Sequence, residues 1–231
     1  MSRFAAACAL ALTSLSAASC GLIDSDVTDF NLKLPEKPFN VDTADWMLSV
    51  TTETMPEVPC PPADCTAAAE EFCSGGACSS TCDTGGHCDA EVPVSVSQPF
   101  DLAKESPELQ TIDSQAAIKV TVETVTFKVK ENTLNVATPP LDLYLAPQGV
   151  LDASNASAVK IGEVDAVEPG QTGDVPIEFT AEGKKSMETY MSAYMTPFTV
   201  IVSGHVTLSA GESVPKGKLS GVVSVTAHAG I

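Results

Sequence analysis

The sequence predicts a mainly β protein: an antiparallel β-sandwich of about seven strands with one amphipathic helix, preceded by a small cysteine-rich disulfide segment. From Ile118 onward, apolar residues recur at every second position in runs that Gly, Pro and Asn separate, a pattern typical of half-buried strands. Six cysteines lie from Cys60 to Cys88, in a segment with too few apolar residues to fill a core of its own. Aromatic residues make up only 5% of the chain, so Val, Ile, Leu and Ala must fill the sandwich.

The N-terminal residues predict export. Arg3 is followed by a stretch of mostly Ala and Leu from Phe4 to Leu15, which is shorter than the roughly 20 apolar residues that a transmembrane helix needs. A short charged start, a short apolar stretch and small residues after it are typical of a cleavable signal peptide. We therefore expect residues 1–19 to be a signal peptide.

The end of this stretch, Ser16-Ala-Ala-Ser19-Cys20-Gly21, resembles the lipobox of bacterial lipoproteins. The resemblance implies cleavage before Cys20, acylation of Cys20 and attachment to a membrane through that lipid. Gly21, in place of Asp, implies the outer membrane, on its periplasmic or surface face, by similarity to enterobacterial sorting. The alternative is an ordinary secretory signal that is cut near Ala18 and leaves Cys20 unmodified.

Two segments are expected to lack regular structure. Residues 20–59 are predicted to be a lipid-anchored tether, because their prolines discourage helix. Within this tether a short helix is expected with Thr43 as its N-cap, and Trp46 is expected to pack on the main domain. Residues 91–115, which also contain prolines, are predicted to be a linker.

The cysteine-rich segment, residues 60–90, is predicted to be held by disulfides. An even number of closely spaced cysteines in an exported chain is typical of a disulfide framework. Spacing alone does not decide which of about 15 pairings forms. We expect a short helix over residues 66–72, and neither a metal nor another cofactor. The predicted disulfide cysteines are Cys60, Cys65, Cys73, Cys78, Cys82 and Cys88.

A metal site is the alternative interpretation of the same segment. His87 and Cys88 lie close in sequence to Cys78 and Cys82, and together they supply enough nitrogen and sulfur ligands for zinc. The segment has neither the C-x2-C pair typical of a zinc knuckle nor the cysteine spacing of a ferredoxin, so disulfides are the favoured interpretation. A catalytic cysteine is not expected, because none is single and matched to a distant histidine.

Residues 116–231 are predicted to form the sandwich. Apolar residues up to Val122 share one strand face, and those from Val125 share a face that is shifted by one position. A shift of this kind predicts a β-bulge at Glu123-Thr124. Further strands are expected over residues 141–145, 159–167, 175–179, 198–208 and 219–227.

One helix is predicted between these strands. Thr180 is expected to cap its start and Pro197 to end it. Five apolar residues follow the i, i+3, i+4 spacing of a single helix face. This stripe is expected to pack over the sheet, and the alternative is an adaptable binding face. The stripe consists of Met187, Tyr190, Met191, Tyr194 and Met195.

The stretch from Val167 to Phe179, the helix after it, the strand from Pro197 to Leu208 and the closing strand together resemble the LEA14/WHy-type domain. The shared order is a polar turn, a strand, an amphipathic helix and a strand that contains a glycine. The resemblance implies a seven-strand sandwich with one helix and a binding or protective role. It carries over no catalytic residue.

Charge and motifs narrow the function further. The formal net charge is −18 and Arg3 is the only arginine, which argues against nucleic acid as a partner. The negative charge suits a cationic ligand, and the alternative is that it serves solubility at the cell surface. An envelope protein is the other expected partner. The catalytic and nucleotide-binding motifs that sequence can reveal are missing, so we expect no catalytic residues. His205 and His228 are expected to point outward, and to be neighbours if the last two strands pair.

The sequence therefore predicts a non-catalytic, membrane-anchored envelope lipoprotein that serves as a binding or structural module. One alternative is a LEA-like protein that protects the envelope under stress. Another is a metal-binding or redox protein that uses the cluster from Cys60 to Cys88.

Overall fold

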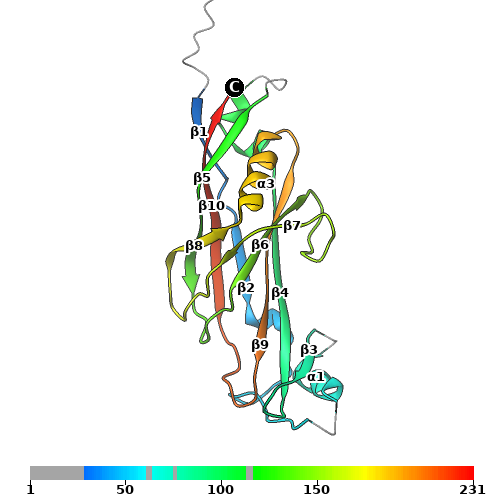
Figure 1. The fold of residues 1–231 in the computed structure, drawn as a ribbon. Coiled ribbons are helices and arrows are strands. Elements are labelled where there is room, and N and C mark those ends of the chain that lie inside the picture. The colour runs from blue at the N-terminus through cyan, green and yellow to red at the C-terminus, as the bar shows by residue number, and fades with distance from the viewer. Residues whose placement is uncertain (1–28, 61–63, 75–76, 113–116) are drawn as a thin grey trace, which may run out of the picture.

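The structure, a computed structural model, describes residues 29–60, 64–74, 77–112 and 117–231. The predicted signal peptide, the predicted lipidation site Cys20 and the start of the predicted tether lie outside the described residues. The described part is an elongated body of antiparallel strands with one longer helix at its side (Figure 1). Its elements are β1 (Asp29–Lys33), β2 (Pro38–Asp42), the 3-10 helix η2 (Thr43–Trp46), α1 (Thr66–Phe72), β3 (Ser79–Cys82), β4 (Cys88–Phe100), α2 (Leu102–Glu105), the 3-10 helix η4 (Leu109–Thr111), β5 (Lys119–Asn132), β6 (Leu141–Pro147), β7 (Val159–Val164), β8 (Gly173–Phe179), α3 (Ala181–Ser192), β9 (Phe198–Leu208) and β10 (Lys218–Gly230).

The mainly β, antiparallel prediction is confirmed. Of the ten strands in the described part, six (β5 to β10) come from the predicted sandwich of residues 116–231 and four (β1 to β4) from the residues before it. Neighbouring strands follow the order β1-β10-β5-β8-β7-β6-β9-β4-β3, and β2 pairs with the end of β10 that β1 leaves free. The sheet folds back on itself at β8, because residues 173–176 pair with β5 whereas residues 177–179 pair with β7. The two halves of the sheet then face each other as a sandwich.

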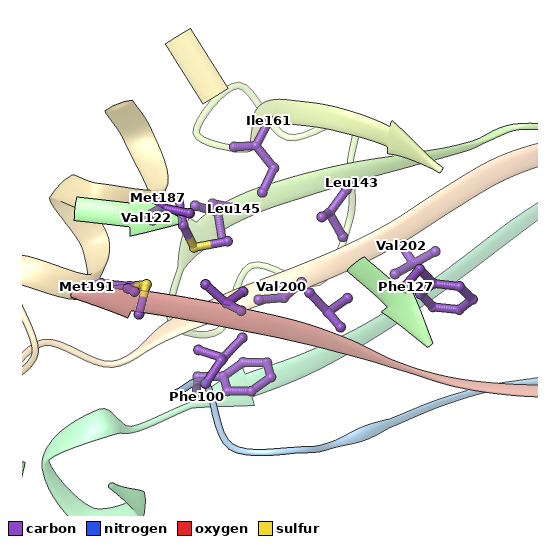
Figure 2. Packing of buried hydrophobic residues seen from close by; sticks show 14 of the residues in the cluster. Phe100, Val122, Phe127, Leu143, Leu145, Ile161, Met187, Met191, Val200 and Val202 are labelled. Atoms are coloured by element: carbon purple, nitrogen blue, oxygen red, sulfur yellow. The ribbon is translucent and has the colours of Figure 1, made fainter. Parts of the chain in front are cut away.

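The core between the two halves is mostly aliphatic, as the composition predicts. Phe127 of β5, Leu143 of β6 and Val200 of β9 are at most 1% exposed. They belong to one cluster with Met187 and Met191 of α3 (Figure 2). Full burial of a side chain of this size contributes about 1.5–3 kcal/mol, so the burial of these side chains stabilises the sandwich.

Helix α3 begins where the sequence predicts but ends earlier, at Ser192, so Tyr194 and Met195 of the predicted stripe follow the helix. The Oγ1 atom of Thr180 accepts a hydrogen bond from the backbone N–H of Gly183 at 2.8 Å, and the helix stops before Pro197. The prediction that its apolar stripe packs over the sheet is confirmed for the buried members of the stripe. Met195 is the exception, since 52% of it is exposed.

The predicted bulge in β5 is also confirmed. Consecutive residues of β10 pair with Thr124 and Val122, so Glu123 is the extra residue. Next to the bulge, the backbone N–H of Val122 donates to the Oε1 atom of Glu188 in α3 at 3.1 Å. Helix side chains therefore satisfy a part of the β5 edge that β8 does not reach.

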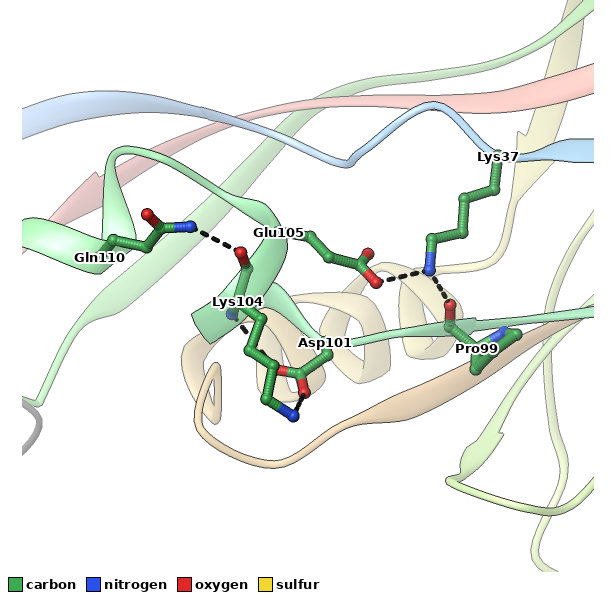
Figure 3. A network of polar contacts seen from close by, with 6 residues as sticks. All are labelled: Lys37, Pro99, Asp101, Lys104, Glu105 and Gln110. Atoms are coloured by element: carbon green, nitrogen blue, oxygen red, sulfur yellow. Dashed lines mark hydrogen bonds and ion pairs between the residues drawn. The ribbon is translucent and has the colours of Figure 1, made fainter.

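A polar network joins the open edges of the two halves (Figure 3). Lys37, in the turn between β1 and β2, donates to the backbone oxygen of Pro99 on β4 and pairs with Glu105 of α2 at 2.7 Å. The side chain of Gln98 donates to the backbone oxygen of Pro38 at 2.7 Å. Side chains thus connect β2 and β4 where no strand ladder does so in the described part of the chain.

Two segments that were predicted to be irregular form strands instead. Within the predicted tether, β1 and β2 pair with β10. Within the predicted linker of residues 91–115, β4 continues to Phe100 and pairs with β9. The linker prediction is wrong because Pro93 and Pro99 occupy positions of β4 whose nitrogens face away from β9, where a strand needs no N–H.

The short helix of the predicted tether is present as η2, but its N-cap differs from the prediction. The Oδ1 atom of Asp42 accepts the N–H of Ala44 at 3.0 Å, and an Asp caps a helix as well as a Thr does. The hydroxyl of Thr43 donates instead to the backbone oxygen of Gly217 at 3.2 Å. Trp46 is 9% exposed and packs against the body, as the sequence predicts.

Candidate functional site

The cysteine-rich segment lies at the end of the body opposite the start of β1 and the C-terminus (Figure 1). We call this end the cysteine lobe and define it as the described residues from 47 to 88. Three disulfides hold it, as predicted, and the structure gives their pairing. They join Cys60 to Cys82, Cys65 to Cys88 and Cys73 to Cys78, with Cα–Cα distances of 6.0, 5.6 and 5.8 Å.

The lobe has an apolar core as well as disulfides. Helix α1 covers the predicted residues, with Cys65 and Cys73 at its two ends, and Phe72 is fully buried. Phe72 belongs to a second cluster with Trp46, Met55 and apolar residues from the ends of β4 and β9. Sequence analysis missed this core because its members come from segments far apart in the chain.

Backbone hydrogen bonds join the lobe to the sandwich. The N–H of Met55 donates to the oxygen of Glu212 in the loop between β9 and β10 at 2.8 Å, and the N–H of Gly211 in the same loop donates to the oxygen of Met55 at 2.9 Å. The first residue of β4 is Cys88, so one disulfide ends directly on a sandwich strand. The lobe is therefore a continuation of the sandwich.

The turn between β3 and β4 is held by Asp83. Its Oδ1 atom accepts the backbone N–H of His87 at 2.7 Å, and this hydrogen bond holds the pKa of Asp83 below its ordinary value. Gly86 in the same turn has a φ of +83°, a conformation that favours glycine. Both features explain how the chain reverses directly before the Cys88 disulfide.

The sulfur atoms of two disulfides lie together inside the lobe. The Sγ atoms of Cys60, Cys65 and Cys88 are within 4.8 Å of one another, and each of these residues is at most 6% exposed. Because each sulfur is bonded to another cysteine, none is a thiolate that could ligate a metal in this state. This grouping also differs from the one around His87 on which the metal interpretation was based.

We expect the exported protein, purified without reductant or chelator, to carry all three disulfides. Its intact mass should be lower than that of the fully reduced chain by two hydrogens per disulfide, without a metal adduct. Proteolysis without reduction should then yield a linked product that contains Cys73 and Cys78 and lacks the other four cysteines. Alkylation of any of the six thiols, or a mass increase equal to one zinc ion, would contradict this expectation.

A groove runs beside β9, at the end of the strand that β6 does not cover. It has a volume of about 600 Å³ and is lined by residues 205–208 of β9 and by residues 135–139, the segment that precedes β6. Exposed Glu168 and Glu212 from two neighbouring loops also line it. We call it the β9 groove. Sequence analysis did not predict the groove, because it depends on where strand pairing stops.

The two outward histidines of the strands are not neighbours. Strand β9 pairs with β4 and β6, whereas β10 pairs with β1, β2 and β5, so the strand pairing that a two-histidine site needs is not formed. The closing strand crosses to the other half of the sandwich instead. His205 lines the β9 groove, and the Nε2 atom of His228 lies 3.5 Å from a carboxylate oxygen of Asp29.

No protein-family model matches the chain, and no curated protein matches its sequence. Among the helices of the described residues, none has the length and apolar character that crossing a membrane requires.

Proposed function

We propose that the chain is an envelope lipoprotein of the outer membrane, anchored through an acyl group on Cys20, that works as a non-catalytic binding module. The pairing of the cysteines carries the proposal. The six described cysteines are bonded to one another, and the only other cysteines of the chain are Cys8 and Cys20. Cys8 lies within the predicted signal peptide, so cleavage would leave Cys20 as the one cysteine without a disulfide partner in the chain.

The disulfides support an exported location. Disulfides form and persist in oxidising compartments such as the periplasm and the cell surface. A mature chain with one remaining thiol directly after a signal peptide fits the resemblance of residues 16–21 to a lipobox. A multi-acyl anchor at this position is sufficient for stable attachment to a membrane.

The short distance from Cys20 to the first strand supports an anchor that holds the body close to the membrane. Strand β1 begins at Asp29, about nine residues after Cys20, and a segment of that length spans at most roughly 30 Å. The end of the body that carries Asp29 would then stay near the membrane. The cysteine lobe, at the opposite end (Figure 1), would face away from it.

We expect Cys20→Ser to abolish acylation and to move the protein from the membrane to the soluble fraction, because the thiol is the acceptor of the lipid. The full chain is expressed in a bacterium that is fed labelled palmitate, and label and protein are followed through membrane fractionation. The matched control is Cys8→Ser, which removes the other cysteine that the disulfides leave unused and should keep both label and membrane attachment.

Palmitate label that persists in Cys20→Ser would contradict the anchor. A wild-type protein that is soluble, unlabelled and cut near Ala18 would instead support an ordinary secretory signal. Either result leaves the fold and the disulfides unaffected, so it bears on location alone.

A LEA-like protective role is the second candidate. The order of β8, α3 and β9, with Gly204 inside β9, supports the resemblance to the LEA14/WHy-type domain. In that case deletion of the gene would lower survival after drying. A survival equal to that of the parent strain would leave the binding module as the better proposal.

A further inference from the structure

We propose that the β9 groove binds an extended segment of a partner polypeptide that carries basic side chains, and that the backbone edge of β9 supplies the hydrogen bonds. The inference rests on the proposed function as a binding module and names the chemistry of the partner. Three observations carry it: an edge of β9 without a strand partner, an opposite wall that is fixed at a distance from that edge, and a lining that is acidic.

Strand β9 loses one of its two neighbours at the groove. It pairs with β4 over residues 198–208, but with β6 only over residues 198–203. The segment that would extend β6 beside β9 contains Pro139 and Pro140, and proline cannot donate to a strand ladder. From residue 205 on, the side of β9 that β6 would cover therefore faces the groove.

The prolines of β4 indicate which backbone groups of β9 point into the groove. Proline is tolerated in a paired strand where its nitrogen faces away from the partner. Pro93 pairs with His205, and Pro99 pairs with Thr199, so at these positions the backbone groups of both strands point away from each other. The backbone oxygen of Pro99 accepts a hydrogen bond from Lys37 in the turn between β1 and β2, which agrees with an orientation of this oxygen away from β9. His205, and by alternation Thr207, direct their N–H and C=O groups into the groove.

The opposite wall is held in place by hydrogen bonds to two neighbouring loops. The side-chain amide of Asn135 donates to the oxygen of Val214 at 3.0 Å and accepts the N–H of Lys216 at 2.6 Å. The N–H of Thr138 donates to the oxygen of Val167 at 3.0 Å, and its hydroxyl accepts the N–H of Val167 at 2.9 Å. These four bonds hold Asn135 and Thr138 to the two loops that contain Glu212 and Glu168, and the wall is thereby anchored at both of its ends.

The lining determines which peptide fits. Glu168 and Glu212 are the acidic residues of the lining, and the Oε2 atom of Glu212 also accepts the N–H of Ser209 at 3.0 Å. No Lys or Arg is among the described residues that line the groove. Opposite charge selects the partner, and main-chain hydrogen bonds to a free strand edge provide affinity. The four residues of β9 at the groove span about 13 Å, so the edge matches about four residues of an extended peptide with basic side chains at alternate positions.

The test uses the full chain, exported and purified without reductant, and a fluorescent probe with the sequence acetyl-Lys-Val-Lys-Val-Lys-amide. Fluorescence anisotropy should show saturable binding. Two control probes have glutamate in place of lysine, or methyl groups on alternate backbone nitrogens. Each should bind about tenfold more weakly or worse, because the first reverses the charge and the second removes the donors of a strand ladder.

Two changes in the protein test the edge and the charge separately. Thr207→Pro removes one N–H that faces the groove and should weaken probe binding about tenfold, while the ladder with β4 stays intact. Its matched control is Ser95→Pro, at an equivalent outward position on β4, which should bind the probe like the wild type. Glu168→Gln combined with Glu212→Gln should weaken binding about fivefold, and Glu178→Gln on β8 should not.

Equal binding of the lysine and glutamate probes, or of the methylated and unmethylated probes, would overturn the proposal. Wild-type affinity for the lysine probe in the Glu168→Gln, Glu212→Gln double variant would also overturn the proposal. This test remains valid even if Thr207→Pro fails to fold. An absence of saturable binding at about 1 mM probe would also overturn it. Membrane attachment does not enter the measurement, so failure of the anchor and failure of the groove are seen in different experiments.

Discussion

Replacing Cys65 and Cys88 together by serine is expected to lower the free energy of unfolding by about 3 kcal/mol. The disulfide joins residues with a sequence separation of 23, and in its absence the unfolded chain regains the freedom of a loop of that size. Cys88 is also only 2% exposed and belongs to the apolar cluster of the cysteine lobe that contains Phe72 and Trp46. Urea unfolding of the exported protein, followed by the fluorescence of Trp46 in the same cluster, measures the effect.

The matched control replaces Cys73 and Cys78. Their sequence separation is 5, so the same loop argument predicts a smaller loss, about 2 kcal/mol. A larger loss from the short loop than from the long one would show that strain or packing, rather than the freedom of the unfolded chain, decides what these disulfides contribute.

Gly183→Ala is expected to destabilise the protein by about 3 kcal/mol, although the same exchange in an exposed helix stabilises it by about 1 kcal/mol. A Cβ atom at Gly183 would lie 1.9 Å from the backbone oxygen of Ile161. That oxygen is part of strand β7 and accepts the N–H of Thr180, so it cannot move aside as the end of a side chain can. Helix α3 would have to lift from β7 and expose Met187 and Met191.

Thermal unfolding and near-ultraviolet circular dichroism measure this effect. Lys185→Ala, an exposed change in the same helix, is the control and should alter the stability by no more than about 0.5 kcal/mol. A Gly183→Ala protein as stable as the wild type would mean that α3 does not pack on β7 as closely as described.

The features that could be predicted from the sequence are those that local periodicity encodes. Alternating residues locate the strands after Ile118, and the phase shift at Glu123 locates the bulge in β5 because one extra residue exchanges the two faces of a strand. The 3.6-residue spacing of Met187 and Met191 locates α3. The helix between Cys65 and Cys73 follows from composition alone, since alanine and glutamate favour helix.

Features that depend on pairing between distant segments could not be predicted. Ala90, Val92 and Val94 alternate as clearly as the later strands, yet their prolines hide β4, because only the pairing partner shows that Pro93 and Pro99 face an open edge. The cysteine pairing depends on the reversal of the chain at Asp83. The β9 groove depends on β6 being the neighbour of β9. Pro139 and Pro140 mark where β6 begins, but no local pattern shows which strand lies beside it.

The direction of β1 determines how the molecule carries a mechanical load. Asp29 pairs with Gly230 and Lys33 pairs with Thr226, so β1 runs along the long axis of the body from the end where the proposed anchor is attached (Figure 1). A partner that pulled on the far end would stretch the molecule between that end and the proposed lipid anchor. The force then acts along β1 and across its hydrogen bonds, which lie perpendicular to the strand. All of these bonds resist in shear at the same time, and the strand does not peel away one bond after another.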